Sequence, residues 1–92
     1  MPADTAVLRD VDLRLTALDE ARRLRPMVVG TLAQLEQAKQ GVSAASGGSA
    51  REQQFLREAA DASLRLAGQQ ERLAKVEAEL RRTAYLLTFL SE

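Results

Sequence analysis

The sequence contains no cysteine, histidine or tryptophan, and its only aromatic residues are one tyrosine and two phenylalanines. Without cysteine there is no disulfide framework and no thiolate metal site. Without histidine the chain lacks the side chain that most often acts as a general base near neutral pH. We therefore expect a protein that is not an enzyme, with no catalytic residues, no cofactor and no metal site.

An excess of one charge is also absent, because thirteen basic residues balance thirteen acidic ones. A neutral chain has no bulk field that attracts nucleic acid or an anionic membrane. No apolar run approaches the roughly twenty residues of a membrane-spanning helix. The N-terminal residues alternate charged and aliphatic side chains, so they lack the apolar core of a signal peptide. These features predict a cytoplasmic protein without a membrane span, with a protein rather than a nucleic acid as its partner.

What the chain does contain is typical of long helices, since Ala, Leu, Glu, Arg and Lys account for 52 of its 92 residues. Its second half carries an apolar repeat with alternating steps of four and three residues, which is the pattern of a helix packed lengthwise on another helix. Only two members of this repeat are polar. The repeat consists of Phe55, Ala59, Ala62, Leu66, Gln69, Leu73, Val76, Leu80, Thr83, Leu87 and Leu90.

A stretch rich in glycine and serine separates the two halves of the chain and predicts a loop over residues 41–48. Gly41 suits the C-terminal cap of the preceding helix. Ser49 and Glu52 form a capping box, in which the hydroxyl accepts from the amide of residue 52 and the carboxylate accepts from the amide of residue 49. We therefore predict one domain over residues 1–92, with helices over 4–40 and 49–90.

The first half carries a similar repeat, which slips once where two steps of three follow each other. Such a slip overwinds a coiled coil locally. Pro26 lies just beyond it and predicts a kink or a short break at residues 21–26. The repeat consists of Leu8, Val11, Leu15, Leu18, Ala21, Leu24, Val28, Leu32 and Leu35.

The two repeats match each other in antiparallel register. Residues that face each other in an antiparallel hairpin have numbers with a constant sum. That sum varies by only one from Leu35 and Phe55 to Leu15 and Val76. The predicted fold is therefore all-α, an antiparallel two-helix coiled-coil hairpin. A single seam gives a thin core, so we expect a dimer or another protein to complete a four-helix bundle.

Two groups of residues are candidates for the interface. Ala60, Ala67 and Ala74 recur at steps of seven, and small residues at this spacing let another helix approach closely. The C-terminal end is apolar around most of its circumference, and the predicted register leaves it uncovered, which is typical of an interface. The candidate interface residues at this end are Tyr85, Leu86, Leu87, Phe89 and Leu90.

The remaining charged motifs favour ordinary solvated surfaces. The pairs Asp10/Asp12 and Asp19/Glu20 diverge around a helix, so neither forms a carboxylate site. Arg22, Arg23 and Arg25 form a basic cluster, and nucleic-acid binding by this cluster is the alternative function. Aromatic residues for base stacking are not interleaved with it, and nearby acidic residues offer salt bridges instead.

The size, the predicted hairpin and the segment of residues 45–49 resemble the small helical-hairpin proteins exported by type VII secretion systems. Those proteins carry Trp-x-Gly at the elbow, where this chain has Ser46. Their export signal has an acidic residue four positions after a tyrosine, whereas in this chain Phe89 lies four positions after Tyr85. Both specific features are missing, so the resemblance extends only to size and shape. Small helical co-chaperones of type III secretion are similar in class alone.

The sequence thus predicts a non-enzymatic interaction module, namely an adaptor, a small chaperone subunit or a structural coiled-coil component. It is expected to act through its helical faces and its apolar C-terminal end, as a homodimer or with another protein. A small helical secretion-system protein or co-chaperone is a further alternative.

Overall fold

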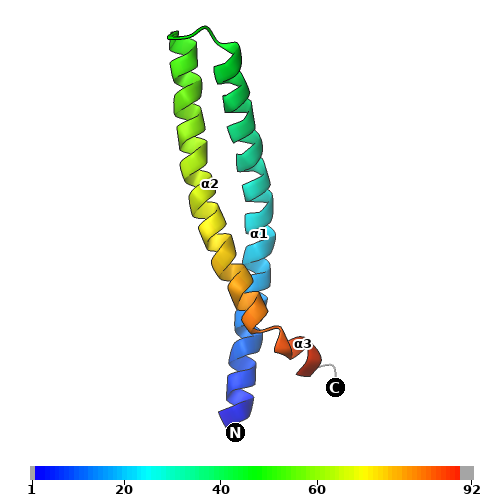
Figure 1. Cartoon of the computed structure of the whole chain (residues 1–92). Helices are drawn as coiled ribbons and strands as arrows, with labels where there is room; N and C mark the ends of the chain where they lie inside the picture. The colour runs from blue at the N-terminus through cyan, green and yellow to red at the C-terminus, as the bar shows by residue number, and fades with distance from the viewer. Residues whose placement is uncertain (1, 90–92) are drawn as a thin grey trace.

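The computed structural model describes residues 2–89, and the chain in this range forms an antiparallel helical hairpin (Figure 1). Helix α1 spans Pro2–Ala44, α2 spans Ala50–Arg82, and a short α3 spans Tyr85–Phe89. The molecule is long and narrow, with principal extents of 68 × 20 × 14 Å. Two long helices packed side by side confirm the predicted all-α hairpin.

Helix α1 extends one turn beyond its predicted end. The amide of Ala45 donates to the carbonyl of Gly41 at 3.0 Å, so Gly41 lies within the last turn and does not cap the helix. Its missing Cβ instead makes room for Phe55, because a Cβ on Gly41 would lie 2.5–2.6 Å from three carbons of that ring. α1 also continues through Pro26, so the short break considered for residues 21–26 does not occur.

The connection between α1 and α2 is a tight turn over residues 45–49. Gly48 has a φ of 77°, a left-handed conformation that favours glycine. The Ser49 hydroxyl accepts from the amide of Glu52 at 3.1 Å, as the capping box predicts. The Glu52 carboxylate, however, accepts from the amide of Gly48 instead of Ser49. The Ser49 amide donates to the carbonyl of Ser46, which leaves the adjacent amide for the carboxylate.

The repeat predicted for α2 faces α1 from Phe55 to Thr83, because every member in that range is buried or half-buried. The repeat predicted for α1 is wrong in part. Leu8, Leu15 and Leu32 are 66%, 60% and 40% exposed. The residues of α1 that do face α2 keep steps of three and four without a slip. This inner seam consists of Val7, Asp10, Arg14, Ala17, Ala21, Leu24, Val28, Thr31, Leu35, Ala38 and Val42, all buried or half-buried.

The observed register of the hairpin is displaced from the predicted one. Phe55 lies against Gly41 rather than Leu35. Val76 packs in a cluster with Ala17 and Ala21, whereas the predicted partner Leu15 is exposed. The predicted register differs because it was based on the large aliphatic residues of α1, whereas α1 packs on α2 partly through alanines such as Ala17 and Ala21.

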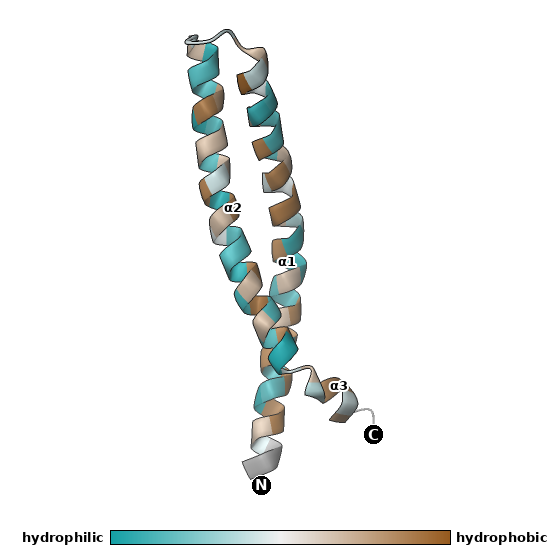
Figure 2. Cartoon of the chain, in the orientation of Figure 1, coloured by the Kyte–Doolittle hydropathy of each residue, from teal (hydrophilic) through white to brown (hydrophobic). Residues whose placement is uncertain are grey.

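The core between the helices is therefore narrow, and several of its side chains are small. It includes a buried cluster of Ala17, Ala21, Leu24 and Val76. Small side chains in such a seam let two helices approach closely, which increases van der Waals contact along the backbone. Apolar segments, coloured brown, also recur along the whole of α1, while α2 shows more teal and pale segments (Figure 2). More apolar side chains lie on α1 than the inner seam can bury.

Helix α2 ends at Arg82, eight residues before its predicted end. The Arg14 guanidinium donates to the carbonyl of Leu80 at 2.8 Å. That carbonyl would accept from the amide of Ala84 in a continued α-helix, and this amide donates to Arg81 instead, at 3.2 Å. The chain turns at Thr83 and Ala84 and leaves in the short α3 (Figure 1).

Candidate interaction surfaces of the hairpin

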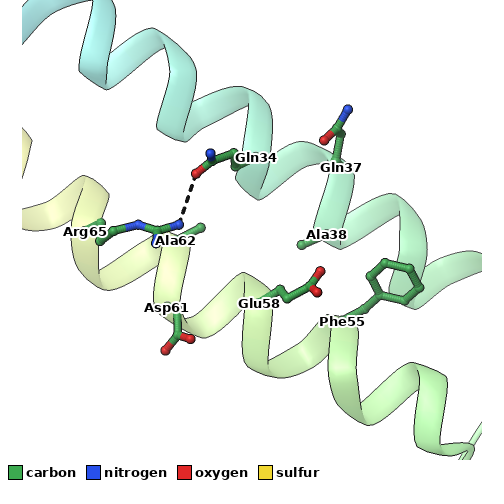
Figure 3. Close-up of a pocket in the computed structure, with 8 residues that line it drawn as sticks. All are labelled: Gln34, Gln37, Ala38, Phe55, Glu58, Asp61, Ala62 and Arg65. Carbon is green, nitrogen blue, oxygen red and sulfur yellow. Dashed lines mark hydrogen bonds between the residues drawn. The ribbon is translucent and has the colours of Figure 1, made fainter.

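One side of the hairpin, which we call the bridged face, carries side-chain links between the two long helices. Arg72 contacts Glu20 at 2.7 Å, and Arg65 donates to the amide oxygen of Gln34 at 3.0 Å (Figure 3). Toward the chain ends, Arg82 contacts Asp10 at 3.1 Å. These exposed links are individually weak, with typical values of about 0–1 kcal/mol. Together they fix which flanks of α1 and α2 lie next to each other.

The bridged face contains a shallow groove of about 320 Å³ near the loop end. Figure 3 shows its polar lining residues, Gln34, Gln37, Glu58 and Asp61, distributed over both helices on either side of Ala38 and Ala62. No nucleophile paired with a base lines this groove. Its chemistry is therefore that of a solvated helix–helix boundary.

The opposite side, which we call the open face, is apolar on α1. It carries a second repeat with steps of three and four that lies next to the inner seam. The members are exposed except for two that are half-buried, Val11 and Leu18. This outer stripe consists of Leu8, Val11, Leu15, Leu18, Arg22, Arg25, Val29 and Leu32. The repeat predicted for α1 mixed the two sets, and its slip marks the crossing from the outer stripe to the inner seam.

The open face is lined by small residues on α2. Ala60, Ala67 and Ala74, the predicted interface alanines, are all exposed. Leu56, Ser63, Gln70 and Glu77 continue the same flank, and Glu77 is half-buried. We call these seven residues the small-residue stripe. It lies beside the outer stripe because the bridged links place the other flanks of both helices together.

The three arginines of the predicted basic cluster lie in different surroundings. Arg23 pairs with Asp19 at 3.3 Å, as the nearby acidic residues indicated. Glu20 instead reaches Arg72 on α2. Arg22 and Arg25 are exposed members of the outer stripe, between Leu18 and Val29 in its order. These two cations therefore lie among aliphatic side chains of the outer stripe.

A polar cluster anchors the end of α2 on α1. Thr83 is fully buried, and its hydroxyl donates to the carbonyl of Glu79 at 2.8 Å. Arg14 donates to that hydroxyl at 3.2 Å as well as to Leu80. One half-buried cation therefore satisfies both the buried hydroxyl and the carbonyl of Leu80, which avoids the cost of an unpaired polar group.

Asp10 extends this cluster to α3, so its prediction as a solvated residue is wrong. Its carboxylate accepts from the Tyr85 hydroxyl and from Arg82. These two hydrogen bonds, Tyr85 first, lower the pKa of Asp10, and the bond to Asp10 raises the pKa of Tyr85. Arg82 also contacts Glu79 at 2.6 Å and lowers the pKa of that carboxyl. The ionised carboxylate and the protonated phenol thus stabilise the same arrangement.

The apolar C-terminal residues differ in exposure. Leu86 is 2% exposed, so it is covered by its own chain and the prediction that it is uncovered is wrong. The turn after Thr83 brings α3 against α1 and places Leu86, rather than Leu87, inside. Tyr85, Leu87 and Phe89 are 45%, 62% and 56% exposed. Leu90 lies outside the described residues.

Within residues 2–89, no group of three or more acidic, histidine or cysteine side chains could hold a metal ion. None of the described helices has the length and apolar character needed to cross a membrane. Comparison with known proteins gives no match to a family model, to a curated protein or to a solved structure.

Proposed function

We propose that the protein is a non-enzymatic interaction module whose main binding surface is the open face of the hairpin. Docking of further helices on this face completes a four-helix bundle. In this role the chain acts as an adaptor, a small chaperone subunit or a structural component.

The observation that carries this proposal is the outer stripe. Leu8, Leu15 and Val29 are each at least 60% exposed, on the same flank of one helix. Aliphatic side chains that recur every three or four residues are the pattern of a helix with a second packing partner. Burying each such side chain contributes about 1.5–3 kcal/mol, and the single chain leaves most of that contribution unused.

The C-terminal end is a second, smaller contact region in this proposal. Leu87 and Phe89 are more than half exposed on a short helix that is anchored through Tyr85. The anchor holds these side chains at a fixed position near the start of α1, which lowers the entropy cost of binding.

Photo-crosslinking tests the binding surface. The photoreactive residue p-benzoylphenylalanine replaces Leu15 on the open face or Leu13 on the bridged face, in the cells that normally make the protein. Leu13 belongs to the bridged face because it lines a groove together with Glu20 and Arg72. Both positions carry a partly exposed leucine on α1, so they form a matched pair. We expect a protein adduct from position 15 and little or none from position 13. Equal yields at both positions, or no adduct at either, would contradict the proposal.

A further inference from the structure

We propose that the partner on the open face is a second copy of this chain, placed so that α1 of each protomer packs on α2 of the other. Both loops then lie at the same end of the bundle. This inference rests on the proposed function and names its occupant.

Side-chain size favours this pairing. The outer stripe of α1 carries leucines and valines, whereas the small-residue stripe of α2 carries alanine and serine at most positions. Large residues of one helix fit over small residues of another, so the part of the outer stripe at Val29 and Leu32 complements the part of the small-residue stripe at Ser63 and Ala67. Contacts across the inner seam fix the height of each residue along the hairpin, since Phe55 lies against Gly41 and Val76 packs with Ala17 and Ala21. At these heights, Val29 of one protomer lies over Ala67 of the other.

Charge favours the same pairing. Among the residues that the structure describes, Arg22, Arg25 and Glu77 take part in none of the ion pairs or side-chain hydrogen bonds within the chain. Packing α1 on the second α2 places Arg22 and Arg25 along the flank that holds Gln70 and Glu77. Each protomer supplies one set, so the contact forms twice around a two-fold axis along the bundle.

The alternative symmetric dimer packs α1 on the second α1 with the loops at opposite ends. Full overlap then aligns the middle of one α1 with the middle of the other, near residue 23 of a helix that spans Pro2–Ala44. Arg22 and Arg25 of one protomer would face Arg25 and Arg22 of the other. Four cations in an otherwise apolar contact are unfavourable, and leucine would face leucine while alanine faced alanine.

The outline of the open face is large enough for an interface of standard size. The hairpin has one broad side of 68 by 20 Å, which exceeds the about 800 Å² per partner of a standard interface. Each helix in the resulting bundle is antiparallel to both of its neighbours, as in up-down four-helix bundles.

Disulfide trapping between single-cysteine variants tests the pairing, because the sequence has no cysteine of its own. Full-length Val29→Cys and Ala67→Cys proteins are purified, mixed at micromolar concentration and oxidised. We expect a disulfide-linked dimer containing one of each variant, in at least tenfold excess over the yield from either variant alone. Both positions are exposed in the single chain, so the substitutions leave the hairpin intact.

Mixing Leu18→Cys with Val29→Cys tests the alternative dimer, which brings these two positions together. A disulfide in this mixture, with none between positions 29 and 67, would overturn the proposed pairing. So would sedimentation of the unmodified protein as a monomer at the same concentration. If the crosslinker at position 15 then captured a different protein, the interaction surface would stand and only the second copy would be wrong. The absence of any adduct in cells would contradict both the binding surface and the proposed dimer.

Discussion

The two stripes of α1 have the same period but different composition. The inner seam contains three polar residues, Asp10, Arg14 and Thr31, alongside its apolar members. The outer stripe contains the more exposed leucines. A ranking by hydrophobicity alone would place the outer stripe in the core. The structure places it outside because the helices of the single chain meet on alanines and because Asp10 and Arg14 find partners on α2 and α3.

This difference teaches that a leucine repeat alone does not show which surface is buried within the chain. The inner seam and the outer stripe both have the spacing of a packing surface, and only the inner one is occupied within the chain. The following experiments test the distinction, from the largest expected effect to the smallest.

Three leucines on the long helices should respond differently to truncation. Leu24 is 4% exposed in the core, so Leu24→Ala is expected to lower the free energy of unfolding by about 2–4 kcal/mol. Leu64 is 74% exposed and lies in neither stripe, so Leu64→Ala should change it by less than about 0.5 kcal/mol. Urea unfolding followed by circular dichroism measures both.

Leu15→Ala completes this series. If the outer stripe is an interface, its effect on urea unfolding should grow with protein concentration, whereas the effect of Leu24→Ala should persist at every concentration. A Leu15→Ala effect that is large and independent of concentration would mean that the outer stripe packs within the chain.

Two glycines of α1 should respond to alanine with opposite signs. Gly30 has no atom within 4 Å of an added Cβ, so Gly30→Ala should stabilise the helix by up to about 1 kcal/mol. Gly41→Ala forces the Phe55 ring to move and is expected to destabilise the hairpin by about 1–2 kcal/mol. Thermal unfolding of both variants gives the sign. Phe55→Leu combined with Gly41→Ala should recover part of the loss, and no recovery would place the strain elsewhere.

The attachment of α3 should depend on pH at both extremes. Because the pKa of Asp10 is lowered from 3.8, its contribution to stability is present above that pH and is lost as the pH falls below it. Because the pKa of Tyr85 is raised from 10.0, its contribution is present below pH 10.0 and is lost as the pH rises beyond it. The contact is therefore strongest between these limits.

Tyr85 is the only tyrosine in a chain without tryptophan, so absorbance near 295 nm reports its ionisation alone. Asp10→Asn should move its titration midpoint down toward 10.0, because the neutral amide no longer opposes the phenolate. Asp12→Asn, on an exposed neighbour, should leave the midpoint unchanged. Equal midpoints in all three proteins would show that the Asp10–Tyr85 contact does not form in solution.

Much of the local structure could be predicted from single residues. Ser49 begins α2 as its hydroxyl predicts, because capping depends on groups three residues apart. The repeat from Phe55 to Thr83 was equally readable, because no competing apolar stripe of large residues lies on α2. The role of Gly41 could not be predicted, because it depends on a ring that lies fourteen positions further along the chain.

The candidate surface could be predicted only in part. The spacing of Ala60, Ala67 and Ala74 indicates an accessible stripe, and the structure leaves all three exposed. The outer stripe could have been found by following steps of three and four from Leu8 without crossing to Ala21. Leu86 could not have been assigned, since its burial depends on the turn that Arg14 and Thr83 impose from opposite helices.

The sequence by itself determined that this chain forms two long helices joined by a short glycine-containing turn, because helix propensity, capping and apolar period are local properties. Only the tertiary structure decided which stripe of α1 faces α2, in which register, and where α2 ends. These choices depend on how closely two helices can approach and on whether Arg14, Asp10 and Thr83 find hydrogen-bond partners. Such partners become neighbours only after the chain has folded back on itself.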